Sequence, residues 1–184
     1  MVASGASAGA QWAPRLAHLP RPRTALLVGG NSSSYVLDPS TAARLGRTVS
    51  AQVRQRGGAL LVTTSARTAA DACDALLAAI DCPAFIHRWR ANDPENPYPA
   101  FLALADRFVV TADSASLVAD ACTMGQPVEV FDWPLRADAR RGLHPSGARA
   151  PSARDRRSLQ AGGTLGAMGR LYDRLVYLGL IKPR

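Results

Sequence analysis

The stretch that decides the fold is Val109–Pro134, VVTADSASLVADACTMGQPVEVFDWP. A β-branched run, Phe108–Thr111, ends at a cluster of Ser and Asp residues. An amphipathic helical pattern follows as far as Gly125, and a second apolar run, Pro127–Phe131, comes after it. This order of strand, polar turn, helix, glycine stop and strand predicts a compact βαβ unit with parallel strands.

The start of the helix in this unit has two interpretations. Asp113 or Ser114 could simply cap the helix, because either side-chain oxygen can accept from first-turn N–H groups. Hydroxyls at a helix N-terminus that follows a parallel strand also make a site for phosphate. Asp113, Ser116 and Asp120 fall at i, i+3 and i+7, so they share one edge of the helix. The spacing alone leaves both interpretations open.

The composition of the chain is that of a globular protein. Its 184 residues are enough for one domain with a full core, and 47% of them are hydrophobic. No apolar run is long enough to span a membrane, and the first residues do not resemble a signal peptide. Three cysteines without CxxC spacing suggest reduced thiols. We therefore expect a cytoplasmic protein, either free or peripheral at the inner face of the membrane, without a transmembrane segment.

The net charge of +8 is concentrated in one part of the chain. Seven arginines fall between Arg136 and Arg157. Such a charge favours anionic partners of any kind. Because the segment has no interleaved aromatic residues and no recognisable motif, we expect no specific nucleic-acid partner and interpret it as a solvated loop.

The pattern along the chain predicts four segments. Residues 1–23 are small and polar, then Pro-rich, and are interpreted as a linker or N-terminal extension. Residues 24–135 alternate apolar runs with helical patterns and form the predicted Rossmann-like domain. Residues 136–163 are interpreted as an Arg-rich mobile loop, and residues 164–184 as a C-terminal helix and tail.

The central segment predicts an α/β fold with a doubly wound parallel sheet of the Rossmann-like type. Right-handed crossovers favour the strand order 3-2-1-4-5, in which the first and fourth strands are neighbours and the winding reverses between them. The predicted strands are Thr24–Gly29, Ala59–Thr63, Pro83–Trp89, Phe108–Thr111 and Pro127–Phe131.

Ligands of such sheets bind at the carboxyl ends of the two strands where the winding reverses. The turns that follow these strands, Gly29–Ser34 and Ala112–Ser116, are the most Gly/Ser-rich turns of the central segment. Backbone N–H groups in both turns could hold a diphosphate. The coincidence of these turns with the reversal predicts a phosphate-binding site.

Several common nucleotide sites are excluded by the residues present. The first strand ends in GGNSSS and the second in TTSART, which matches neither GxGxxG nor the acidic residue of a dinucleotide site, although Arg67 could meet a 2′-phosphate. The only lysine, Lys182, is far from any Walker motif. The three histidines are not spaced as metal ligands, so we expect no metal ion.

Four motifs together resemble the mitochondrial-fission ELM (elongated mitochondria) family, which has many bacterial members. They are TALLVGGNSSSYVLD, the TSART turn, NPYPAFLALADRFVVTADSASLVADACTMGQPV and the final FDWP. The resemblance covers roughly residues 12–134 and corresponds to the C-terminal half of the family. That half is similar to the C-terminal domain of GT-B glycosyltransferases, which holds the nucleotide-sugar donor.

The resemblance implies roles for individual residues. Gly29, Gly30 and Asn31 would face the diphosphate, and Ser114 and Ser116 would bind phosphate oxygens. Asp120 would accept from the ribose hydroxyls, in a place where the family's usual acid is a glutamate. The candidate residues are Gly29, Gly30, Asn31, Ser32, Ser65, Arg67, Asp113, Ser114 and Ser116 for the phosphates, and Asp120, Asn96 and Tyr98 for the ribose and base.

These observations lead to two hypotheses on function. The first is the nucleotide-sugar donor-binding half of a GT-B-like glycosyltransferase, with a nucleoside-diphosphate sugar as substrate and no further cofactor. The chain begins where the second half of the family begins, so we expect the acceptor-binding domain to be missing or supplied by another chain. The isolated chain should then be inactive, and no catalytic residue is assigned. The alternative is a non-catalytic binding or interaction module with the same fold.

Overall fold

A computed structural model describes residues 2–133, with side chains from residue 5 onward. The strands within these residues are β1 (Arg23–Leu27), β2 (Ala59–Thr63), β3 (Ala84–His87), β4 (Arg107–Thr111) and β5 (Val128–Phe131). They form a five-stranded sheet in the order β3-β2-β1-β4-β5, and every pair is parallel. The prediction of a doubly wound, Rossmann-like α/β sheet is therefore confirmed. The predicted Arg-rich loop and C-terminal helix lie outside the described residues.

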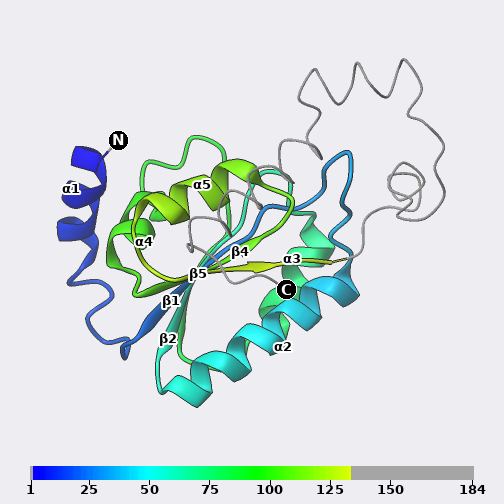
Figure 1. The fold of residues 1–184 in the computed structure, drawn as a ribbon, viewed down its shortest axis with the longest axis horizontal. Coiled ribbons are helices and arrows are strands. Elements are labelled where there is room, and N and C mark those ends of the chain that lie inside the picture. Colours follow the sequence, from blue (N-terminus) through cyan, green and yellow to red (C-terminus); the bar gives the residue numbers. More distant parts are fainter. Residues whose placement is uncertain (1, 134–184) are drawn as a thin grey trace, which may run out of the picture.

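Helices cover both faces of the sheet (Figure 1). Their bounds are α1 (Val2–Trp12), α2 (Pro39–Arg56), α3 (Ala70–Ala78), α4 (Tyr98–Leu104) and α5 (Ala115–Thr123). Helices α2 and α3 lie together on one face, and α1, α4 and α5 lie on the other. This arrangement explains why β1 and β2 are buried along their whole length, since a parallel sheet between two helical layers has no solvated face.

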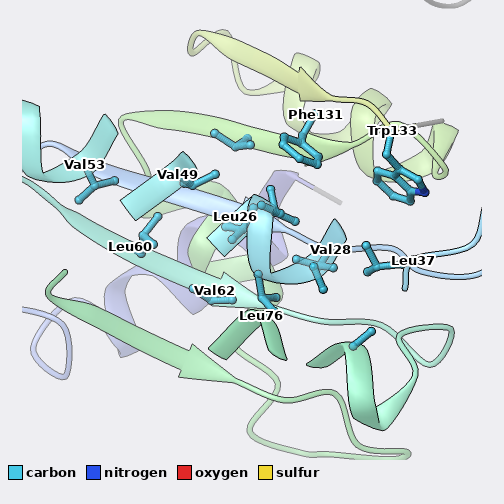
Figure 2. Close-up of a cluster of buried hydrophobic side chains, with 14 residues drawn as sticks. Leu26, Val28, Leu37, Val49, Val53, Leu60, Val62, Leu76, Phe131 and Trp133 are labelled. Carbon is cyan, nitrogen blue, oxygen red and sulfur yellow. The ribbon is translucent and has the colours of Figure 1, made fainter. Parts of the chain in front are cut away.

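Alternate residues of the central strands enter two separate hydrophobic clusters. Leu26 of β1 and Leu60 of β2 point toward α2 and α3, where Val49 and Leu76 pack on them (Figure 2). Leu27, the next residue of β1, belongs to the cluster on the side of α4 and α5. The period-two alternation of side chains along a strand therefore supplies both cores.

Helix α2 is capped at both ends. The Asp38 carboxylate accepts from the backbone N–H groups and the hydroxyls of Ser40 and Thr41, and these bonds lower its pKa to about 2. Gly57 follows the helix with φ 69°, the left-handed conformation in which glycine ends a helix. These two caps fix where α2 begins and ends and therefore the length of the turn between β1 and α2.

Part of the segment interpreted as a linker or N-terminal extension, residues 1–23, forms a packed helix. Residues Val2–Trp12 form α1, which packs against α4. Trp12 is buried, and its ring meets Phe85 edge to face at a centroid distance of 5.6 Å. A Cβ placed on Gly9 would lie 3.1 Å from the Ala103 Cβ, so small residues let the two helices approach closely. The Ala/Gly/Ser composition that suggested a linker is therefore the contact surface of a packed helix.

Replacement of Trp12 by alanine tests this packing. Because the indole is buried against Phe85 and α4, Trp12→Ala should lower the free energy of unfolding by about 3 to 5 kcal/mol, as large-to-small changes in a core do. The measurement is urea denaturation followed by circular dichroism. The exposed neighbour Gln11→Ala is the matched control and should have little effect. Equal stability of the two variants would contradict the packing of α1.

Candidate functional site

The turns at the carboxyl ends of β1, β2 and β4 are joined by one buried carboxylate. Asp113 follows β4, and its side chain is 0% exposed. Its Oδ2 accepts from the Gly30 N–H after β1 at 2.9 Å and lies 2.8 Å from Nη1 of Arg67 after β2. A single side chain therefore connects three turns at the point where the winding of the sheet reverses.

The two glycines after β1 make room for this carboxylate. A Cβ at Gly29 would overlap both Asp113 carboxylate oxygens, so the close approach requires a residue without a side chain. Gly30 has φ +148°, and a Cβ there would overlap the backbone carbonyl of Arg67. The Asp113 Oδ1 is buried without a hydrogen-bond partner among the described residues. The pair of glycines therefore serves to pack the turn on Asp113 and Arg67.

The backbone N–H groups of the turn after β1 donate within the protein. The Gly29 N–H donates to Thr111 Oγ1 at 2.7 Å and the Gly30 N–H to Asp113. The Asn31 N–H donates to the Arg67 carbonyl, and the Ser32 N–H to the Tyr35 carbonyl, both at 2.9 Å. A diphosphate could accept hydrogen bonds from these N–H groups only if it displaced their present acceptors.

Side chains of the predicted phosphate set also hold these turns in place. The Ser65 hydroxyl donates to the Gly29 carbonyl, and Asn31 Oδ1 accepts from the Leu37 N–H. Ser32 Oγ accepts from the Tyr35 N–H at 3.1 Å. The Arg67 Nη1 also donates to the Asn31 carbonyl at 3.0 Å, yet its side chain is 40% exposed. Of these residues, Arg67 combines a positive charge with access to solvent.

The start of α5 carries two serine hydroxyls, and its first-turn N–H groups have no side-chain cap. Ser114 occupies the N-cap position, as predicted, but its side chain makes no capping hydrogen bond. Its hydroxyl instead lies 3.3 Å from Ser116 Oγ. Asp113, the other predicted cap, is bonded to Gly30 and Arg67. The helix ends as predicted, since Gly125 follows it with φ 75°.

The three residues predicted for ribose and base are brought together. The Tyr98 hydroxyl at the start of α4 donates to Asp120 Oδ2 on α5 at 2.7 Å. Asn96 Oδ1 accepts from the Tyr98 N–H at 3.0 Å. Asp120 follows Ser116 by one helical turn, so the same edge of α5 carries the hydroxyls and the carboxylate.

The structure contains a polar pair at the end of β3 that the sequence did not predict. His87 is buried, and its Nε2 lies 2.9 Å from Asp93 Oδ2 in the loop that leads to α4. The hydrogen bond from His87 is the largest cause of the lowered pKa of Asp93. No local pattern pairs a strand residue with a loop residue six positions on, so the sequence carried no signal for it. The pair fixes the loop that bears Asn96 and leads to Tyr98 at the start of α4.

Within residues 2–133, no group of at least three His, Cys, Asp or Glu side chains is placed to hold a metal ion. Among the helices of the described part, none is long and apolar enough to cross a membrane.

The sheet order and the joined turns define a Rossmann-like α/β domain. Its candidate site lies at the switch point, the place between β1 and β4 where the winding of the sheet reverses. Residues 2–144 match the family described as "Mitochondrial fission ELM1". The "Mitochondrial fission protein ELM1" of Arabidopsis thaliana is 32% identical over 128 residues, which is 70% of this chain and 30% of that protein. The chain belongs to the mitochondrial fission ELM1 family, as its motifs suggested, and spans less than a third of this relative's length. No solved structure matches the chain.

The close approach of Gly29 to Asp113 gives a prediction for stability. Gly29→Ala should lower the free energy of unfolding by about 1 to 3 kcal/mol, because the added methyl must displace a buried, ion-paired carboxylate. Gly5→Ala is the matched control, since a Cβ there meets nothing within 4 Å and alanine favours a helix. Thermal unfolding of both variants checks this. A Gly29→Ala protein as stable as the Gly5→Ala protein would contradict the geometry.

The lowered pKa of Asp93 gives a prediction for pH dependence. Because the folded-state pKa lies below the unfolded one, the contribution of Asp93 to stability is present above about pH 4 and is lost as the pH falls through the folded-state value. Wild type should therefore exceed Asp93→Asn in stability at pH 5, and the difference should shrink toward pH 2.5. Urea denaturation across this range measures it. A constant difference would show that the Asp93 charge is not the cause.

Proposed function

We propose that this chain is a nucleoside-diphosphate-binding domain, the part of a GT-B-like glycosyltransferase that holds the nucleotide-sugar donor. The observation that carries the proposal is the start of α5. It opens at the switch point beside β1 and β4, its first-turn amides have no side-chain cap, and the hydroxyls of Ser114 and Ser116 accompany them. Uncapped amides at a helix N-terminus are a general means of binding phosphate.

The phosphates would be held chiefly by α5. The positive end of the helix dipole and the first-turn N–H groups favour an anion there. The turn after β1 contributes less, because its N–H groups already donate to Thr111, Asp113 and neighbouring carbonyls. Arg67 is half-exposed and positively charged, and it can approach a phosphate while its Nη1 stays on Asp113.

The ribose and base would extend along α5 toward α4. Asp120 lies one turn beyond Ser116, and a carboxylate there can accept from ribose hydroxyls. Tyr98 and Asn96 lie beside it at the start of α4. The spacing of one helical turn between Ser116 and Asp120 therefore suits a ligand with an anionic group at one end and hydroxyls next to it.

Sugar transfer by this chain alone is not part of the proposal. The chain spans 30% of its Arabidopsis relative, and transfer requires donor and acceptor to be held in one geometry. We expect weak nucleotide binding and no transfer unless another domain or chain supplies the acceptor site.

The engaged turn after β1 favours a second candidate, a non-catalytic interaction module. A turn in which the N–H groups of Gly29 to Ser32 are bonded within the protein can serve as a rigid scaffold without a ligand. The name of the Arabidopsis relative refers to mitochondrial fission and to no reaction. Nucleotide binding distinguishes the two candidates.

Calorimetric titration of UDP, GDP, NAD and inorganic diphosphate tests the proposal. One of the two nucleoside diphosphates should bind more tightly than NAD or inorganic diphosphate. Asp120→Ala should then weaken its binding by about one to two decades, the usual value of a hydrogen bond to a charged group. Asp71→Ala is the matched control, because this acid lies on α3 at the opposite face of the sheet. Tightest binding of NAD, or no binding at millimolar ligand, would contradict the proposal.

A further inference from the structure

The hydrogen bond between Tyr98 and Asp120 joins two helices beside the proposed phosphate site. The Tyr98 hydroxyl is 2.7 Å from Asp120 Oδ2, and the two residues are 22 positions apart in sequence. The Tyr98 ring is partly buried and packs against the hydrophobic cluster under α4 and α5. The hydroxyl is therefore a donor fixed by the core, whereas an aspartate on a helix surface would otherwise sample several rotamers.

The tyrosine remains a donor at any working pH. Burial, followed by the hydrogen bond and charge of Asp120, raises the pKa of the Tyr98 phenol above its usual range. Asp120 thus receives a hydrogen bond on Oδ2 from a hydroxyl that keeps its proton. Its other oxygen, Oδ1, has no partner among residues 2–133 and is left to accept from a ligand.

We propose that Tyr98 is a positioning residue that holds the Asp120 carboxylate with one oxygen free, and that this arrangement makes the site select ribonucleotides over deoxyribonucleotides. The inference rests on the proposed nucleoside-diphosphate site and specifies the sugar that it recognises. A carboxylate oxygen held at a fixed position forms a stronger hydrogen bond with a ribose hydroxyl that reaches it, because little freedom is lost on binding. A ligand that lacks this hydroxyl leaves the oxygen without its partner and loses that hydrogen bond.

The chain also gives the inference a selective variant. Tyr98→Phe keeps the ring that packs in the core and removes only the hydroxyl. Asp120→Ala removes the acceptor itself. Inorganic diphosphate is the control ligand, because it occupies the phosphate end and has no ribose.

The experiment measures the affinities of UDP, 2′-deoxy-UDP, 3′-deoxy-UDP and inorganic diphosphate for wild type, Tyr98→Phe and Asp120→Ala. In wild type, at least one deoxy analogue should bind about tenfold more weakly than UDP. Tyr98→Phe should reduce this ratio to about threefold or less, and Asp120→Ala should abolish it. The affinity for inorganic diphosphate should stay unchanged in all three proteins, which a general loss of structure would not allow.

The outcomes separate the inference from the function on which it rests. UDP binding with the same ribose preference in wild type and Tyr98→Phe overturns the positioning role and leaves the nucleotide site standing. Equal affinity of wild type for UDP and both deoxy analogues overturns the ribose assignment. Failure of wild type to bind UDP and GDP at millimolar concentration overturns the proposed function and the inference together.

Discussion

The buried carboxylate of Asp113 is the constraint on which the carboxyl edge of the sheet depends. A charge with no exposed surface is costly unless it is paired and hydrogen-bonded, and Asp113 meets this need through Oδ2, which contacts Arg67 and the Gly30 N–H. Because these partners follow β2 and β1, satisfying the charge brings three turns to one point. Gly29 is required for the same reason, since any side chain there would occupy the place of the carboxylate.

Most of the fold was predictable from the sequence. Continuous apolar runs such as Ala59–Thr63 suit strands buried on both faces, and the right-handed crossover rule leaves few orders for five parallel strands. Helix α1 was not predictable in this way. Its contact surface consists of small residues around Gly9 together with Trp12, and such Ala/Gly/Ser composition is equally typical of a linker. Its packing depends on the partner helix α4, which local composition does not reveal.

The location of the candidate site could be predicted from the sequence, but the hydrogen bonds within it could not. Topology alone placed the turns after β1 and β4 side by side. The partners of Asp113 could not be predicted, because Gly30 is 83 positions away and the local pattern favours a helix cap. Tyr98 and Asp120 were both expected in the site from a family resemblance, yet their direct hydrogen bond joins two helices and has no signal in either one.

A diphosphate could bind at the uncapped start of α5 or at the turn after β1, where it would have to displace existing hydrogen bonds. The chemical shifts of the backbone amides show which of the two it contacts. The most direct measurement is a titration of the ¹⁵N-labelled chain with UDP, followed through amide chemical shifts. Binding at α5 predicts the largest shifts at Ala115, Ser116 and Leu117, with smaller shifts at Gly30 and Asn31, whose N–H groups keep their acceptors within the protein. Shifts that leave the first turn of α5 unchanged would contradict a phosphate site there.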